Sequence, residues 1–265
     1  MDSRSMLDYV RFYRRVRRRS REPYDVVHAN YGLTGPMALA QSIRPVVVSF
    51  WGSDLLGNVG RMSRLCARLA DAVIVMSNEM DGMLKTESHV IPHGVDLDLF
   101  RPFSREAARR SVGWRSDATH VLFPYASQRE AKDYPRAERV VDRVRGRIDG
   151  DVVLQTLHDV PHALMPLYMN AADVLLLTSK SEGSPNSVKE AMACNLPVVA
   201  TDVGDVSERL AGVDPSFVCR TDGALCDGLI DVLGARRPSN GREAVEPLGI
   251  DRMGERIKAV CESVL

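Results

Sequence analysis

Short runs of β-branched and other apolar residues alternate with amphipathic stretches along most of the chain. Continuous apolar runs predict strands buried on both faces, and the amphipathic stretches predict helices that cover them. The expected strands are 25–28, 45–50, 72–76 and 89–91, then 119–124, 151–156, 173–178, 197–200 and 216–219. The expected helices are 3–21, 34–42, 60–70, 77–85, 134–146, 162–171, 186–194, 205–211 and 222–234. This alternation predicts parallel sheets joined by right-handed crossovers.

The alternation breaks at residues 91–102, which contain two prolines and a glycine and show no clear periodicity. We interpret this segment as a linker between two α/β halves, with a long surface loop inside one sheet as the alternative. The predicted fold class is α/β, with two Rossmann-like parallel-sheet domains of which the first is incomplete. The first half opens on a helix, whereas a Rossmann-like half normally begins with a strand and a tight turn. The expected domains are a partial N-terminal domain at 1–102, a complete domain at 103–250, and a helix at 251–265 that packs back toward the N-terminal domain.

The composition of the chain is that of an ordinary globular protein and argues against several other classes of protein. The 265 residues are 45% hydrophobic and 26% charged, as in ordinary soluble proteins, and this length suits two modest domains. The 35 basic residues balance 35 acidic ones, which argues against nucleic-acid binding through a global basic excess. Five cysteines without a C-x-x-C pair indicate neither a disulfide framework nor a zinc site, as expected in a reducing cytosol. No apolar run reaches the roughly 18 residues that span a membrane.

A group of candidate functional residues follows the expected strand 173–178. Glu182 and Gly183 follow that strand, and Ser184 with Pro185 is expected to open the next helix as capping hydroxyl and first-turn proline. The unpaired N–H groups and the dipole of that helix form an anion site at the carboxyl edge of the sheet, where open α/β sheets bind ligands.

The helix that follows carries a second carboxylate. Asn186 and Glu190 are four positions apart and share a helix face, and Glu190 could accept hydrogen bonds from a diol such as ribose. A solvated helix with a capping serine explains the same pattern about as well. A serine nucleophile is a poor alternative, because the G-x-S-x-G elbow is missing.

Several motifs together carry a family resemblance. Glu182 and Glu190 form an E-x7-E pair, and Asn-Leu-Pro-Val-Val-Ala-Thr-Asp-Val-Gly-Asp follows at 195–205. Ile-Pro-His-Gly-Val-Asp stands at 91–96, Val-Ser-Phe-Trp-Gly-Ser-Asp at 48–54, and Asp-Val-Val-His-Ala-Asn at 25–30. From about residue 24 onward the chain resembles family 4 of the glycosyltransferases, which are retaining enzymes of the GT-B fold that use nucleotide sugars. The resemblance implies sugar transfer to a glycan or lipid-linked acceptor, and its nearest branch implies cell-surface polysaccharide synthesis.

The resemblance also implies roles for single residues. Glu182 would lie near the donor sugar and Glu190 would hold the ribose. Arg129 and Lys132 follow the strand near 121–124 and match the basic pair that stabilises the leaving diphosphate in the family. The spacing of Arg129 from the lysine differs from the commonest family pattern. The alternative is that both residues are solvated charges of a loop. The expected donor-binding set is Gly183, Ser184, Pro185, Asn186, Ser187 and Glu190. His158 and His162 fall where the family contacts the nucleotide base, with plain surface histidines as the alternative.

The same basic pair implies that no divalent metal and no cofactor is needed beyond the nucleotide-sugar donor. Asp202 and Asp205 flank a glycine and are expected to be structural.

The expected acceptor side is Trp51, Gly52, Ser53 and Asp54. Trp51 stands where several family members have a histidine; a tryptophan can stack on a sugar ring but cannot transfer a proton. Retaining transfer does not require a protein base, because the leaving phosphate can take the acceptor's proton. For Ser53 and Asp54 a turn-forming role is the alternative.

The resemblance also implies that family members have strands and a glycine-rich loop before the position of Tyr24, so we expect an N-terminally truncated first domain. The predicted function is therefore a retaining hexosyltransferase-type activity. The alternatives are a non-catalytic nucleotide-sugar-binding protein, a partner of a full-length transferase, and a truncated product without an independent role.

The N-terminal segment is strongly basic, since residues 11–21 contain seven arginines. Leu7, Val10, Tyr13 and Val16 form an apolar stripe at helical spacing, and a basic amphipathic helix can bind anionic lipid. A helix packed on the first domain with a solvated arginine face is the alternative, and a nucleic-acid arm is not expected. The expected location is the cytoplasm, with peripheral contact at the inner face of the membrane if the 3–21 helix binds lipid.

Overall fold

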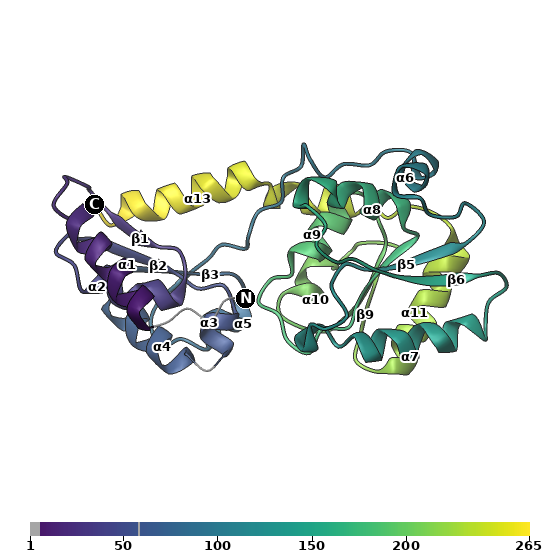
Figure 1. Cartoon of the computed structure of the whole chain (residues 1–265), viewed down its shortest axis with the longest axis horizontal. Coiled ribbons are helices and arrows are strands. Elements are labelled where there is room, and N and C mark those ends of the chain that lie inside the picture. Colours follow the sequence, from purple (N-terminus) through teal and green to yellow (C-terminus); the bar gives the residue numbers. More distant parts are fainter. Residues whose placement is uncertain (1–5, 58) are drawn as a thin grey trace. The chain divides into compact units, whose positions relative to one another are not determined.

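The computed structural model describes residues 6–57 and 59–265, without the side chains of Met6, Leu7 and Leu56. The chain divides into two compact units, one made of residues 1–92 with 253–265 and the other of residues 93–252 (Figure 1). The division falls within the 91–102 segment that the sequence indicates as a linker. Residues 3–5 of the expected N-terminal helix lie outside the described residues.

The first unit is built on a four-stranded parallel sheet of order β1-β2-β3-β4. Its strands are β1 (Val27–Ala29), β2 (Val46–Ser49), β3 (Ala72–Val75) and β4 (His89–Val90). Its helices are α1 (Met6–Arg19), η1 (Gly32–Thr34), α2 (Gly35–Leu39), α3 (Ser53–Leu56), α4 (Gly60–Leu69) and α5 (Asn78–Gly82), joined by most of α13 (Ile250–Ser263). Val260 of α13 belongs to the same buried core as Val46 and Ile74.

The second unit is built on a five-stranded parallel sheet of order β6-β5-β7-β8-β9. Its strands are β5 (Thr119–Phe123), β6 (Val152–Thr156), β7 (Val174–Leu177), β8 (Val198–Thr201) and β9 (Phe217–Cys219). Its helices are α6 (Arg105–Val112), η2 (Glu130–Lys132), α7 (Tyr134–Arg145), η3 (His162–Leu164), α8 (Met165–Ala171), α9 (Asn186–Ala193), α10 (Val206–Arg209), α11 (Asp222–Ala235), α12 (Gly241–Val245) and η4 (Glu246–Leu248).

Helices cover both faces of the second sheet (Figure 1). Alternate residues of β5 enter two different cores, since Leu122 packs with α8 and α9 whereas Val121 and Phe123 pack with α7 and α11. This alternation buries each strand on both faces, which is why the strands have continuous apolar sequences.

The predicted α/β class with two parallel sheets is confirmed, and each of the nine expected strands is present within two residues of its expected bounds. The expected 162–171 helix is a 3-10 turn followed by α8. The sequence analysis missed α3, α6 and α12. Helix α6 has a local signature that could have revealed it, because the Ser104 hydroxyl accepts from the Ala107 N–H at 3.3 Å and Gly113 ends the helix with φ of 71°. None of the described helices has the length and apolar character needed to cross a membrane.

Candidate functional site

The candidate donor residues of the second unit lie in loops that follow three adjacent strands. Because β5, β7 and β8 are parallel neighbours, their carboxyl ends meet at one edge of the sheet. The loop after β5 carries Arg129 and Lys132, the loop after β7 carries Glu182, and the loop after β8 carries Asp205. The fold therefore assembles one site from segments that are distant in sequence.

An ion pair joins the first two loops. The Lys132 ammonium contacts Oε1 of Glu182, and the Ser179 hydroxyl donates to the same oxygen at 2.6 Å. The Lys132 and Glu182 side chains are only 9% and 14% exposed. Burial lowers the pKa of Lys132, and the neighbouring Glu182 charge partly opposes that shift. Two of the predicted catalytic residues are therefore in direct contact.

Tyr125 lies beneath the basic pair and was missed by the sequence analysis. Lys132 Nζ lies 4.0 Å from the centre of the Tyr125 ring, and the Arg129 guanidinium lies 5.4 Å from it. The Tyr125 hydroxyl lies 2.6 Å from Oγ of Ser187, in the first turn of α9. Burial, followed by the charge of Glu182, raises the pKa of Tyr125, so the phenol keeps its proton. An aromatic residue directly after a buried strand was the available signal.

The start of α9 differs from the expectation. The helix begins at Asn186 with Pro185 as its N-cap and without a side-chain cap, so the prediction that Ser184 caps it and Pro185 opens its first turn was wrong. The Ser184 hydroxyl instead donates to Oδ2 of Asp205 at 2.7 Å and accepts from Lys189 Nζ at 2.9 Å. The charged partners outcompete the backbone N–H groups for this hydroxyl.

Lys189 is fully buried in α9 and extends this network. Its ammonium also donates to the His93 carbonyl at 2.7 Å, which ties the loop that precedes α9 to the 91–96 motif. Burial lowers the pKa of Lys189 to about 8 and raises the pKa of Asp205. Sequence reasoning did not single out this lysine, because a lysine in a helix is usually solvated.

Glu190 is almost fully buried, and its Oε1 lies 2.8 Å from Nε2 of His162. The structure thus brings His162 to the residue expected to hold the ribose. His158 is exposed and contacts its neighbour Asp159 at 2.8 Å. Asn186 is exposed at the first position of α9, where it and Glu190 are one turn apart.

A glycine in the loop after β8 supports the loop after β7. Gly204 has φ of 56°, and a Cβ there would lie 2.5 Å from the carbonyl oxygen of Gly183. Only glycine fits this approach, because a side chain would displace the backbone beside Glu182. Asp202 is engaged by Arg220 and Ser207. Across residues 6–57 and 59–265, groups of three side chains suited to hold a metal ion are not found.

The expected acceptor-side residues lie on the first unit: Trp51 and Gly52 in the turn after β2, and Ser53 and Asp54 at the start of α3. Both oxygens of the buried Asp54 carboxylate accept backbone N–H groups: Oδ1 those of Trp51 and Gly52 at 2.8 and 3.1 Å, and Oδ2 that of Gly32 at 2.7 Å. Trp51 is half-buried and donates its indole N–H to the Asn30 carbonyl at 2.9 Å. Ser53 is exposed and lies 3.3 Å from the Tyr31 hydroxyl. The geometry of Asp54 favours the turn-forming role.

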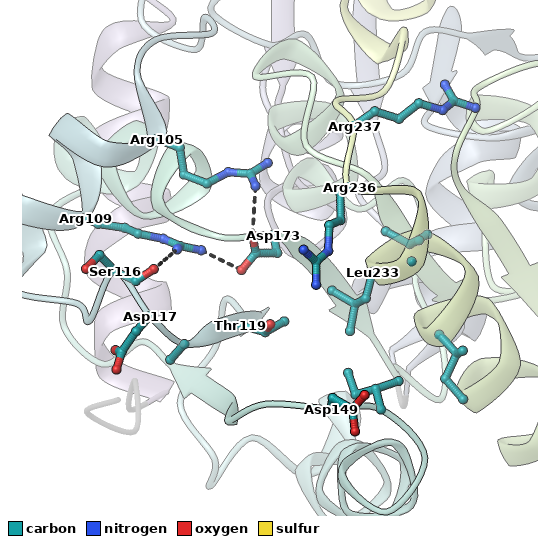
Figure 2. Close-up of a pocket in the computed structure, with 15 residues that line it drawn as sticks. Arg105, Arg109, Ser116, Asp117, Thr119, Asp149, Asp173, Leu233, Arg236 and Arg237 are labelled. Carbon is teal, nitrogen blue, oxygen red and sulfur yellow. Dashed lines mark hydrogen bonds and ion pairs between the residues drawn. The ribbon is translucent and has the colours of Figure 1, made fainter.

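A separate cavity of about 480 Å³ opens at the opposite, amino edge of the second sheet (Figure 2). Arg105 and Arg109 converge there on Asp173, with nitrogen–oxygen distances of 2.8 and 2.6 Å, and the backbone N–H of His120 donates to Asp173 at 2.7 Å. These contacts tie α6 to the starts of β5 and β7. The cavity is therefore distinct from the site at the carboxyl edge, where open α/β sheets bind ligands.

Two α/β units, each with a parallel sheet, form the GT-B fold of glycosyltransferases, which solved structures with TM-scores of 0.80 and 0.78 to this chain share. Two family models match the chain, "Glycosyltransferase Family 4" over residues 2–99 and "Glycosyl transferases group 1" over residues 131–234. The chain belongs to glycosyltransferase family 4.

The individual relatives and solved structures described next are each less than 30% identical to this chain. A D-inositol 3-phosphate glycosyltransferase of Catenulispora acidiphila is 26% identical over 71% of this chain and 57% of its own length. The putative teichuronic acid biosynthesis glycosyltransferase TuaC of Bacillus subtilis is 27% identical over 69% of this chain and 54% of its own length. The structure of Anabaena HepE in complex with UDP and glucose has a TM-score of 0.78 and 16% identity, and the match covers 99% of this chain and 84% of that one. The chain thus spans little more than half the length of these two curated relatives.

Proposed function

We propose that this protein transfers a sugar, with retention of configuration, from a nucleoside diphosphate sugar to a hydroxyl of a glycan or lipid-linked acceptor. We also propose a role in cell-surface polysaccharide synthesis in the cytoplasm. The relation to TuaC, whose name refers to teichuronic acid biosynthesis, supports that role.

The observation that carries the proposal is the contact between Lys132 and Glu182 beside the start of α9. A diphosphate at this edge would meet Lys132, Arg129 and the N-terminal backbone of α9, which are all electropositive. Glu182 would lie at the sugar end, and Glu190 would accept hydrogen bonds from the ribose.

In the proposed reaction the bond between the anomeric carbon and the diphosphate oxygen breaks while the acceptor oxygen bonds to the same face of the sugar. The acceptor's proton passes to a phosphate oxygen of the leaving group, so atoms and charge balance without a protein base. Lys132 and Arg129 stabilise the charge that grows on the diphosphate. Because two cations serve this purpose, we propose that the reaction needs no divalent metal.

The test is an assay with UDP-, GDP- and ADP-sugars and a glycan or lipid-linked acceptor, with the anomeric configuration of the product read by NMR. Glu182→Gln is expected to reduce kcat at least about 100-fold, within the range found for groups that act on the transition state. Glu255→Gln, at an exposed position of α13, is the matched control and should keep wild-type activity. Inversion at the anomeric carbon, or full activity of Glu182→Gln, would contradict the proposal.

A non-catalytic nucleotide-sugar-binding protein gives a different result in the same experiment. The nucleotide would raise the melting temperature, since a ligand that binds only the folded state stabilises it, but none of the donors would turn over.

A further inference from the structure

The outward face of α1 is a continuous row of arginines. Arg11, Arg14, Arg15 and Arg18 have the i, i+3, i+4, i+7 spacing that places side chains on one helix face, and all four are exposed. Figure 1 shows α1 on the first unit beside α2. We call these four residues the arginine face.

The opposite face of α1 packs on the protein. Tyr9, Tyr13 and Val16 are half-buried, and the Tyr13 hydroxyl donates to the Ala40 carbonyl, just after α2, at 3.3 Å. Of the stripe expected from the sequence, Tyr13 and Val16 therefore face inward, whereas Val10 is 47% exposed. The helix cannot insert this stripe into a bilayer while it remains folded on the unit.

Most charges of this helix are not neutralised by the protein. Arg11 lies 3.8 Å from Asp8, and Arg19 lies 2.8 Å from Glu22. Among the described residues, an acidic partner in an ion pair is not found for four arginines of α1, Arg14, Arg15, Arg17 and Arg18, nor for Arg21, which follows the helix. Such a density of unpaired cations repels itself, and an anionic surface relieves that repulsion.

Exposed apolar side chains and two grooves flank the arginine face. Phe12 is 43% exposed and lines a groove of about 420 Å³ with Leu33 and Met37. On the other flank, Val10 lines a groove of about 860 Å³ with Arg14, Arg17, Arg18 and Arg21. Phosphate groups suit the second groove, and shallow acyl contacts suit Phe12 and Val10.

We propose that the arginine face binds the headgroups of an anionic phospholipid bilayer, by electrostatic attraction and without insertion of the helix. The apolar flanks favour a bilayer over nucleic acid, because Phe12 and Val10 would meet the boundary between headgroups and acyl chains. This surface acts independently of the site on the second unit, and its test does not require turnover.

The experiment is co-sedimentation of the full chain with neutral phosphatidylcholine vesicles and with vesicles that contain about 30 mol% phosphatidylglycerol. Binding is expected only with the anionic vesicles at about 0.05 M NaCl, and it should be lost at about 0.5 M NaCl, where charges are screened over a few ångströms. Each arginine near such a surface contributes about fivefold, so Arg14→Gln/Arg15→Gln/Arg18→Gln is expected to bind roughly 100-fold more weakly.

A matched variant keeps the test specific. Arg110→Gln/Arg139→Gln/Arg143→Gln removes three exposed arginines from the second unit and should bind vesicles as the wild type does. Equal melting temperatures of both variants and the wild type show that the folds are intact. The proposal is overturned if binding is equal for neutral and anionic vesicles, if both triple variants weaken it equally, or if short duplex DNA binds while vesicles do not.

Discussion

The Tyr125 hydroxyl lies 2.6 Å from Oγ of Ser187, which joins the loop after β5 to the first turn of α9. The ring of the same tyrosine lies under Lys132 and Arg129. One side chain thus connects the proposed diphosphate contacts to the helix N-terminus.

Two substitutions separate these two roles of Tyr125. Tyr125→Phe removes one hydrogen bond and is expected to weaken UDP-sugar binding about fivefold, in keeping with about 1 kcal/mol for such a bond. Tyr125→Leu also removes the ring and should weaken binding by a further fivefold or so, because the cation–π contacts are lost. Calorimetric titration with UDP-glucose measures both, and equal affinity of the wild type and Tyr125→Leu would refute this role.

Gly204 should be intolerant of any side chain. Gly204→Ala is expected to destabilise the protein by about 1–3 kcal/mol and to weaken donor binding, because the added Cβ displaces the backbone at Glu182 and Gly183. Gly212 has φ of 76° with open space around it, so Gly212→Ala carries the backbone strain alone. Urea unfolding should detect a loss in both variants, whereas donor affinity should fall only in Gly204→Ala.

The buried ammonium of Lys189 should be essential for stability. Lys189→Met removes one of the two cations beside the buried Asp205, leaving Arg209 at 3.2 Å, and is expected to cost about 3 kcal/mol in the free energy of unfolding. Adding Asp205→Asn to that variant should recover part of the loss, because the buried carboxylate that has lost its contact with Lys189 is made neutral. Lys258→Met, on the exposed side of α13, is the control and should change stability by less than about 0.5 kcal/mol. If the losses in unfolding free energy of the two single variants simply add up in the double variant, the two side chains do not interact, and the proposed network is contradicted.

His120 should make stability depend on pH in the acidic range. Its ring lies 2.8 Å from the Arg115 carbonyl at Nε2 and 2.9 Å from the Gln155 amide nitrogen at Nδ1, so Nε2 carries the proton and Nδ1 accepts. Burial lowers the pKa of His120 in the folded protein.

As the pH falls below about 6.5, the unfolded chain therefore takes up a proton that folded His120 does not, and the free energy of unfolding decreases. His120→Gln should reduce this slope between pH 7 and 5. The half-buried His28 and His93 also have lowered pKa values and will keep part of the slope. An unchanged slope in His120→Gln would show that the imidazole charges freely in the folded state.

Chelation provides a direct test of the metal-free reaction. Transfer in excess EDTA is expected to proceed at the wild-type rate, whereas Lys132→Met should lose transfer in the presence or absence of Mg²⁺. Restoration of Lys132→Met by Mg²⁺ would indicate that a metal can replace the lysine, and inhibition of the wild type by EDTA would contradict the proposal.

The strands could be predicted because each depends on a local pattern, as in Val46–Ser49, where four consecutive buried residues mark a strand covered on both faces. Glu182 and Lys132 could be selected by motif, but their contact joins positions 50 residues apart, and the sequence does not reveal such pairings. The same limit explains the error at Ser184, since its partner Asp205 lies 21 residues later. Tyr125 and Lys189 were missed because each resembles an ordinary residue of its element until the burial around it is known.

Val260 completes the core that contains β2 and β3, although the whole second unit lies between them in the chain. During synthesis, residues 93–252 are therefore made before the first unit has its last core residues. Domains usually fold in the order in which they leave the ribosome. In this chain the second unit has all of its elements before α13 is made, so it can complete its core first, whereas the first unit gains the α13 part of its core last.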